Sequence, residues 1–567
     1  AGALLMSGDR VAHAVPESPV VETAYGRVRG RRVNGCEIYR GIPYGASTGG
    51  AARFEPPREP VPWTGVREAD RNGDRCPQGP EAMAEGPMSE DCLALNVWTP
   101  GRAPGAKRPV MVWLHPGGFH GGAGYQYTGQ GNLAKRGDVV QVEVNHRLNV
   151  FGYLYLQGLG DLQGLGDLQG LGDRFPDSGN VGMLDLVAAL EWVRDNIAAF
   201  GGDPDNVTIF GESGGGSKVS TLMAMPAARG LFHKAIAQSG FALRAVEPEE
   251  ATRHARALLA TLDLGTNLEA LQKVPTDALL AAFQRVRVDH PRAFRPTLDG
   301  RTLTHHPWHP AAPPESADVP LMLGVTRDET TILLGLLGPD PDAMWKMSEA
   351  EMREGLTEYL SVAPTETDAL IAAYRASWKD ASPADLYFRI TSDWMMRLPS
   401  ILQAERKAAQ PGAPAYLYLF TWDSPAFGPG MGAHHGAELT FVFDTLDEQA
   451  ERIGTGEDRR RLADQMLGAW SRFAHTGDPN HAGLPSWKPY SSESRDTMIF
   501  DMPSRTEGDP LAAGRIALAP ILERSLARSA SSADGARLTA AASRTWPAPA
   551  RLDRERPGRN SPRRSAG

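Results

Sequence analysis

The chain has 567 residues and a net charge of −9, and 41% of its residues are hydrophobic. No apolar run approaches the roughly 18 residues of a membrane-spanning helix, and the acidic balance argues against a nucleic-acid partner. Because no linker interrupts residues 20–520, we expect one large α/β domain at 20–524, between an N-terminal segment (1–19) and a tail (525–567).

The two ends of the chain differ from its body. The sequence "AHA" at 12–14 resembles the end of a trimmed signal peptide, so we expect a secreted or periplasmic protein; Asp9 and Arg10 interrupt the apolar stretch, which leaves a cytoplasmic protein as the alternative. The tail holds nine arginines and three acidic residues, which leaves −15 on the rest of the chain. Its Ser, Ala, Pro and Arg content without an apolar period predicts disorder.

Three cysteines occur, at Cys36, Cys76 and Cys92. The sequence has no CxxC pair and no Cys/His cluster, so it predicts no structural metal. If the protein is exported, we expect a disulfide between Cys76 and Cys92.

The first strong strand signal is the apolar run Val110–Leu114, which is followed by "HPGGF". Adjacent glycines expose backbone N–H groups, so Gly117 and Gly118 are candidate donors of an oxyanion hole. A plain strand-to-loop turn is the alternative interpretation. A second predicted strand, 139–145, precedes a threefold repeat of "LQGLGD" at 156–173. Its period is too short for a solenoid, so we expect a tolerated duplication in a loop.

The pattern Gly-x-Ser-x-Gly occurs twice, around Ser47 and around Ser213. Only Ser213 has the context of a nucleophile elbow: an amphipathic helix predicted over 186–200, a strand over 206–210, and a helix-compatible segment up to Pro226. We therefore predict that Ser213 is a nucleophile whose following residue, Gly214, supplies a third oxyanion donor. Ser47 is interpreted as a loop serine.

A serine nucleophile needs a base and an acid that orients the base. The predicted strand Val319–Thr326 is followed by Asp328 and Glu329, and residue chemistry leaves both open as the acid. His434 and His435 are adjacent, so at most one of them can reach the serine.

Six separated motifs resemble the type-B carboxylesterase family, which includes the cholinesterases. They are "EDCLALNVWTP", "HPGGF", "NVGMLDLVAALEWVRDNIAAFGGDPDNVTIFGESGGG", "GLFHKAIAQSG", "GVTRDE" and "HHGAELTFVFD". The resemblance extends over about 20–505 and keeps the order of the family. It implies an α/β-hydrolase fold, with a mostly parallel central sheet, helices on both faces and large insertions around the active site.

The resemblance also implies a triad of Ser213, Glu329 and His435, since the base of the family directly precedes a glycine and stands three residues before a glutamate. It implies no cofactor, and cleavage of short- to medium-chain or aryl esters through an acyl-enzyme. The alternatives are an amide or carbamate hydrolase with the same triad, and a non-catalytic adhesion relative. The segment between Cys76 and Cys92 is short and lacks aromatic residues, so we expect no preference for choline esters.

Three positions depart from the pattern of the family: Pro116 and Gly214 replace its usual Gly and Ala, and Lys218 replaces a residue that is commonly small. We expect Lys218 to cap a helix face, with a place near the pocket as the alternative. In the insertion 340–400, four residues are candidates for the pocket, with a place in the core as the alternative: Phe388, Trp394, Met395 and Met396.

Overall fold

The computed structural model describes residues 19–79, 84–103, 105–159, 174–265, 267–336, 341–425 and 430–528. Segment 1–18, repeat residues 160–173 and tail residues 529–567 lie outside the described residues. The last helix, α17 (Ala512–Arg528), continues past the expected domain end at 524.

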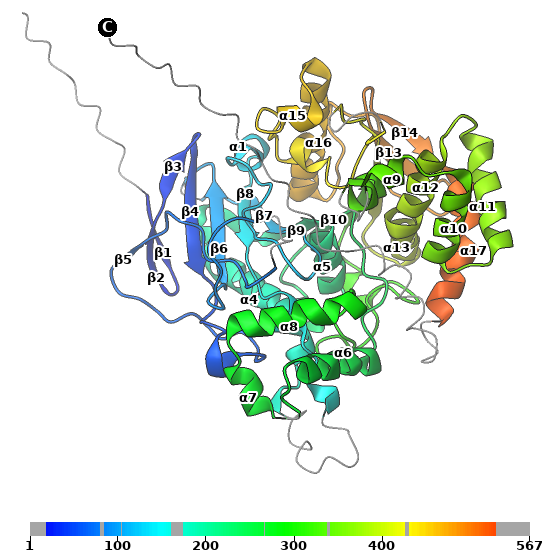
Figure 1. Cartoon of the computed structure of the whole chain (residues 1–567). Helices are drawn as coiled ribbons and strands as arrows, with labels where there is room; N and C mark the ends of the chain where they lie inside the picture. Colours follow the sequence, from blue (N-terminus) through cyan, green and yellow to red (C-terminus); the bar gives the residue numbers. More distant parts are fainter. Residues whose placement is uncertain are drawn as a thin grey trace, which may run out of the picture.

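The architecture is built on an 11-stranded sheet (Figure 1). Its strands, in spatial order, are β14 (Arg505–Gly508), β13 (Asp496–Phe500), β12 (Ala415–Phe420), β11 (Leu321–Thr326), β10 (Lys234–Gln238), β9 (Gly202–Glu212), β7 (Arg108–Leu114), β8 (Val140–Val144), β6 (Ala94–Thr99), β4 (Cys36–Pro43) and β3 (Arg31–Val33). All pairs from β13 to β8 are parallel, and the pairs at both edges are antiparallel. The mostly parallel sheet is therefore confirmed.

Helices cover both faces of this sheet, as predicted. The cluster on one face contains residues of α2 (Asn149–Tyr153), α4 (Val181–Asn196), α5 (Gly214–Leu222) and α13 (Leu398–Ala409), together with α6 (Pro248–Thr261), α7 (Leu268–Lys273) and α8 (Thr276–Asp289). The cluster on the other face contains residues of α1 (Asn132–Gly137), α14 (Leu439–Val442), α15 (Ala450–Ile453) and α16 (Glu457–Thr476).

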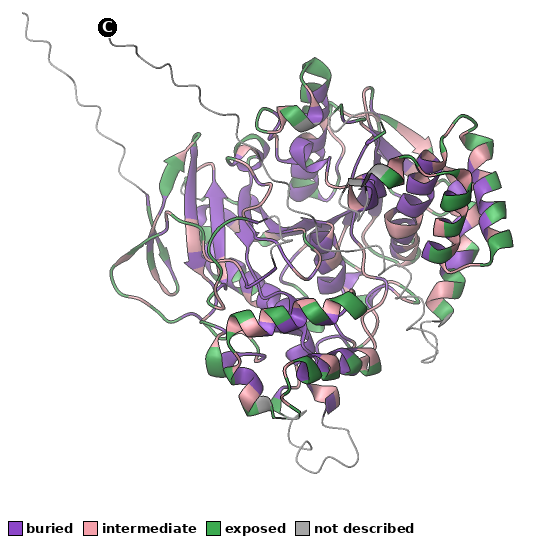
Figure 2. Cartoon of the chain, in the orientation of Figure 1, coloured by how far each residue is buried: buried purple, intermediate pink, exposed green. Residues whose placement is uncertain are grey.

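Strand β7 shows why the sheet is covered on both sides. Val110, Val112 and Leu114 belong to the first cluster, whereas Met111 and Trp113 belong to the second. Successive side chains of a strand point to opposite faces, so a strand that is apolar at every position must bury both of them. β8, β10, β11 and β12 are buried at every position, and β7 and β9 are buried in their carboxyl-terminal parts (Figure 2).

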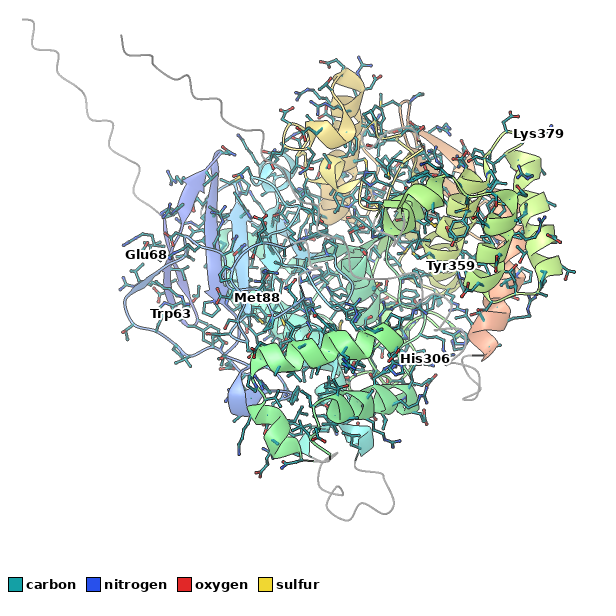
Figure 3. All side chains as sticks on the ribbon, in the orientation of Figure 1. Trp63, Glu68, Met88, His306, Tyr359 and Lys379 are labelled. Atoms are coloured by element: carbon teal, nitrogen blue, oxygen red, sulfur yellow. The ribbon has the colours of Figure 1, made fainter. Side chains whose placement is uncertain are left out.

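Two smaller units flank the sheet. A 3-stranded sheet of β1 (Val20–Thr23), β2 (Gly26–Arg29) and β5 (Val66–Glu68) lies at one end, where Figure 3 labels Trp63 and Glu68. At the other end, near Lys379 in Figure 3, the insertion forms a helical unit with its own core. Its helices are α9 (Pro341–Trp345), α10 (Glu349–Leu360), α11 (Pro364–Ser377), α12 (Pro383–Ser392) and α17.

The strand order places two loops side by side. β8 and β9 lie on opposite sides of β7, so the connections reverse direction there, and Leu114 at the end of β7 pairs with Gly211 near the end of β9. In parallel α/β sheets, such a switch point at the carboxyl ends of the strands is where ligands bind. The HPGGF loop follows the end of β7, and Ser213 follows the end of β9, so both lie at this switch point.

A buried ion pair fixes the chain after β8 to helix α4. Arg147 donates from Nη2 to Asp185 Oδ1 (2.6 Å) and from Nε to Asp185 Oδ2 (2.8 Å), and its backbone N–H also reaches that carboxylate (2.9 Å). The two side chains are 2% and 0% exposed. Removing one charge of such a pair leaves the other buried and unpaired.

We expect Asp185→Asn to lower the free energy of unfolding by about 3–5 kcal/mol. The midpoint of chemical unfolding measures this loss. Asp195→Asn, on the same helix, is the matched control, because the Arg194–Asp195 pair is about half exposed and such pairs contribute less than about 1 kcal/mol. Equal shifts of the midpoint in both variants would contradict the assignment.

Candidate active site

Ser213 stands in a sharp turn between β9 and α5, as the sequence predicts. It is the residue before the first helical position and has φ 56° and ψ −119°. Its N–H donates to the Gln238 carbonyl at 2.8 Å, and its carbonyl accepts from the N–H of Ser217 at 3.0 Å. A non-glycine residue with positive φ is strained, and these bonds hold it in place. The helix ends at Leu222, before the limit expected at Pro226. Ser47 lies in a loop.

The glycines after Ser213 allow backbones to touch. A Cβ added to Gly214 would lie 2.2 Å from the Gly118 carbonyl oxygen and 2.4 Å from the Gly118 nitrogen. A Cβ on Gly215 would lie 1.9 Å from the carbonyl oxygen of Leu114. In this structure a side chain at either position would require the neighbouring backbone to move, because atoms of Gly118 and of Leu114 occupy its space.

The three candidate oxyanion donors lie in this contact region. Gly117 and Gly118 have φ of 100° and 64°, which favour glycine. Among the described residues, no protein acceptor receives a hydrogen bond from the N–H of Gly117, Gly118 or Gly214. The Gly118 nitrogen lies beside Gly214, since a Cβ at Gly214 would be 2.4 Å from it. Pro116 precedes them, and its carbonyl oxygen is 2.8 Å from His115 Nδ1.

His435 is in direct contact with Glu329. The distance from His435 Nδ1 to Glu329 Oε2 is 2.5 Å, and the two side chains are 10% and 0% exposed. The other carboxylate oxygen of Glu329 accepts from Ser239 Oγ at 2.6 Å and from the N–H of Thr326 at 2.9 Å. This carboxylate is therefore fixed on three sides.

The neighbouring candidates have other contacts. Asp328 pairs with Arg327 at 2.7 Å and accepts from the N–H of Ala433 at 3.0 Å. His434 is buried, and its Nδ1 lies 3.0 Å from the His435 carbonyl oxygen. The geometry thus favours Glu329 over Asp328 and His435 over His434.

The second nitrogen of His435 faces a carboxylate that the sequence analysis did not single out. His435 Nε2 lies 3.1 Å from Glu212 Oε1. Within the described ranges, Ser213 Oγ forms no hydrogen bond. Contacts between nucleophile and base are often loose without substrate. The contact of His435 with Glu212 is one of charge and not a hydrogen bond, because Glu212 Oε1 accepts none. Glu212 directly precedes Ser213, so its place in the motif was a usable signal.

The charge balance of the site is unusual. Burial alone would lower the pKa of His435, but the carboxylates of Glu212 and Glu329 outweigh it and raise the pKa to about 10. Burial raises the pKa of Glu212 to about 7, against the opposing effect of His435. For Glu438, burial together with Glu212 and Glu329 raises the pKa to about 8. The protonation of His435 is therefore coupled to that of the buried glutamates around it.

Glu438 extends this buried network. It accepts from Gln238 Nε2 at 3.3 Å, and Gln238 Oε1 accepts from Trp470 Nε1 at 2.9 Å. In the sequence, Glu438 only distinguishes the two histidines, and Gln238 and Ser239 are only part of a motif. The tertiary structure shows that Gln238 bonds to Ser213, that Ser239 bonds to Glu329, and that Glu438 helps to raise the pKa of His435.

The expected disulfide is not formed in the structure. Cys36, Cys76 and Cys92 are free, buried thiols. A hydrogen bond with Cys76, together with burial, raises the pKa of the Cys92 thiol well above its ordinary value. Cys76 Sγ also accepts from the N–H of Leu148 at 3.2 Å. The two side chains are neighbours, and the structure has no covalent bond between them.

Other expectations concern the surroundings of the site. Lys218 does not cap a solvent-facing side of its helix, because it is fully buried. Phe388 is buried in the core of the helical unit, Trp394 and Met395 are half-buried against it, and Met396 is half-buried against a small cluster at β11. Phe388 also lines a cavity with Asp328 and Gly432.

The described residues contain no group of three or more His, Cys, Asp or Glu side chains that could hold a metal ion. None of their helices combines the length and the apolar character needed to cross a bilayer.

Comparison with known proteins decides the family. The model of the carboxylesterase family matches residues 17–515. The chain belongs to the carboxylesterase family. This carboxylesterase is 36% identical over 517 residues to the para-nitrobenzyl esterase of Bacillus subtilis (strain 168), covering 88% of this chain and 98% of the relative. It is 32% identical to the phenmedipham hydrolase of Pseudarthrobacter oxydans, over 85% and 94% of the two chains.

Solved structures agree. The carboxylesterase superposes on a carboxylesterase of Geobacillus stearothermophilus with a TM-score of 0.76 at 36% identity, covering 88% of this chain and 99% of the other. A para-nitrobenzyl esterase structure gives a TM-score of 0.73 at 35% identity, with the same coverage. The α/β-hydrolase fold is thereby confirmed, and the protein is an ester hydrolase.

The carboxylate at Glu212 gives a testable dependence on pH. A base must be neutral to accept a proton, so kcat/KM rises with pH as His435 loses its proton. Glu212→Gln removes a charge that raises the pKa of His435. We expect the acidic limb of the kcat/KM profile to move to lower pH by about one unit or more. Steady-state kinetics across the pH range in which both proteins stay folded measure this shift, and a limb that stays in place or moves to higher pH would contradict it.

Proposed function

We propose that this carboxylesterase cleaves esters through an acyl-enzyme formed on Ser213, with His435 as base and Glu329 as the acid that orients it. The observation that carries the proposal is the 2.5 Å contact between His435 Nδ1 and Glu329 Oε2, beside a serine in a strained turn. A serine hydroxyl is a poor nucleophile by itself and needs such a base.

The proposed cycle consists of acylation of the serine and hydrolysis of the acyl-enzyme. Ser213 Oγ attacks the ester carbonyl carbon while His435 Nε2 takes its proton, and the imidazolium then gives that proton to the departing alcohol. Water, activated by the same nitrogen, releases the acid and restores the serine. Glu329 accepts from Nδ1–H throughout and stabilises the charged ring.

The oxyanion that forms at each attack needs donors. The N–H groups of Gly117, Gly118 and Gly214 have no protein acceptor among the described residues, so they are free to bind this oxygen. Losing one such donor typically costs about 3–4 kcal/mol of transition-state stabilisation. No step requires a cofactor.

Glu212 adds a requirement to this cycle. Because the Glu212 carboxylate lies 3.1 Å from His435 Nε2, it stabilises the protonated imidazole, and His435 must lose that proton before it can accept one from Ser213. Burial raises the pKa of Glu212 to about 7, so Glu212 itself takes up a proton near neutral pH. Its attraction for the ring weakens when it does.

For the substrate, we propose short- to medium-chain or aryl esters. Support comes from relatives that are named for a para-nitrobenzyl ester. The same machinery acts on amides or carbamates if their leaving groups accept the proton of His435, and this is the second candidate activity.

The two adjacent histidines test the assignment of the base. We expect His435→Ala to lower kcat by about 10⁴-fold or more, as loss of a triad base does, and His434→Ala to affect mainly binding or stability. The readout is kcat for a p-nitrophenyl ester in both variants. A severe loss in His434→Ala with near-normal turnover in His435→Ala would reverse the assignment.

Covalent labelling of the wild type and of a Ser213→Ala variant tests the nucleophile. A fluorophosphonate should label the wild-type enzyme at Ser213 and leave Ser213→Ala unlabelled, as mass spectrometry of the labelled peptide would show. Absence of an adduct at Ser213 in the wild-type protein would overturn the proposed mechanism.

A series of p-nitrophenyl esters of increasing acyl length tests the substrate class. We expect kcat/KM to be highest for short and medium chains. Because the alcohol is the same throughout, differences report on the acyl side of the site. A maximum at the longest chain would indicate a lipase-like preference, and faster cleavage of matched anilides or carbamates would favour the second candidate.

A further inference from the structure

Lys218 is a buried cation that the proposed mechanism does not use. It lies in α5, the helix that begins after Ser213, and its side chain is 0% exposed. Among the described residues, no carboxylate forms an ion pair with it. Buried charges are costly unless they are paired, so a lysine at this position calls for a specific role.

The contacts of Lys218 all lead to the HPGGF loop. Its Nζ donates to the His115 carbonyl at 3.0 Å and lies 5.9 Å from the ring centroid of Phe119. These two residues bracket Gly117 and Gly118, the loop half of the proposed oxyanion hole. Lys218 thus links that half to the helix whose first residue, Gly214, provides the other half.

The loop has separate anchors at its two ends. After the glycine pair, Gln78 holds both the N–H and the carbonyl of Gly122, at 2.7 and 3.0 Å, and the N–H of Asn149 donates to the Phe119 carbonyl at 2.7 Å. Before the pair, the His115 carbonyl accepts a hydrogen bond from Lys218 and, within the described ranges, from no other group. The first anchor therefore depends on one amine.

We propose that Lys218 is a positioning residue that holds the donors of the HPGGF loop in register with the donor of Gly214. This inference rests on the proposed oxyanion hole. The positions of oxyanion donors matter within a fraction of an ångström. The peptides of Gly117 and Gly118 are held within the turn, where His115 Nδ1 contacts the Pro116 carbonyl and the N–H groups of His120 and Gly121 donate to the Gly117 carbonyl. The turn therefore moves as a unit with His115. Without the amine, the His115 carbonyl is left buried and unsatisfied, and the turn loses its hydrogen bond to α5.

The charge of Lys218 is not essential to this role. Burial lowers its pKa to about 7. The imidazoles that face it, His115 and His146, have pKa values well below the ordinary range, first because they are buried and then because Lys218 is near. An ammonium and a neutral amine both donate hydrogen bonds, so the link persists in either form.

The chain offers a matched control. Lys407 is also fully buried and donates to two backbone carbonyls, those of Ser316 (2.6 Å) and Ala317 (2.9 Å). It lies in α13, and its hydrogen bonds are with Ser316, Ala317 and Gln410, outside the proposed site. Lys407→Met thus reproduces the loss of a buried amine from backbone carbonyls without touching the HPGGF loop.

The test compares Lys218→Met and Lys407→Met in the full-length enzyme. We expect Lys218→Met to lower kcat on the order of 10- to 100-fold with little change in KM, because the donors bind the transition state and not the ground state. Affinity for an aryl trifluoromethyl ketone, which adds to the serine and places an oxyanion in the hole, should fall by a similar factor. Lys407→Met should lower the unfolding midpoint and keep wild-type kcat.

Two results would overturn the proposal: wild-type kcat and inhibitor affinity in Lys218→Met, or an equal loss of kcat in Lys407→Met. If Lys218→Met does not fold, Lys218→Gln decides. Its amide donor is one bond too short for the His115 carbonyl, so a folded Gln variant that matches the wild type also overturns the proposal. Fluorophosphonate labelling of the wild type distinguishes failure of the proposed function from failure of this inference. Absence of an adduct at Ser213 would overturn the proposed function. Normal labelling together with unaffected Lys218 variants would overturn only the role of Lys218.

Discussion

At Gly118 and Gly214 two backbones touch with no side chain between them, and the arrangement of the candidate site depends on that contact. A Cβ at Gly214 would overlap the Gly118 backbone. The contact brings N–H groups from two distant parts of the chain to one place, next to a serine held at positive φ. In this structure α5 and the HPGGF loop pack this closely on the ends of β7 and β9 because Gly214 and Gly215 have no side chain.

Electrostatics impose the second constraint. Three buried glutamates surround one imidazole, and burial keeps two of them from ionising at their ordinary pKa. Glu329 is fixed by Ser239 and Thr326. Glu212 is free to compete for the other ring nitrogen. A base with a strongly attached proton is a poor acceptor, so protonation of these neighbours governs when the site is ready to react.

The sheet and the helical insertion each position part of the candidate site. The sheet, buried on both faces, fixes the ends of β7, β9 and β11, where the catalytic candidates begin. The helical unit supports the acid: Thr330, next to Glu329, donates to the Phe388 carbonyl at 2.9 Å and to Ser392 Oγ at 3.0 Å. An insertion outside the sheet thus helps to hold a residue at its edge, which ties variation in that insertion to the site.

The sequence by itself determined the strands at β7, β9 and β11, the turn at Ser213 and the candidate set, because apolar periodicity and glycine spacing are local properties. It left Asp328 and Glu329 open on chemical grounds, and only the fold brings Glu329 to His435 while Asp328 turns to Arg327. Glu212 stands next to Ser213 in the motif, but only the tertiary structure shows that it lies against His435. Tertiary structure alone placed Glu438 and Lys218, and left Cys76 and Cys92 as free thiols. Burial and contact between residues far apart in the chain are properties of the folded molecule, and no local pattern records them.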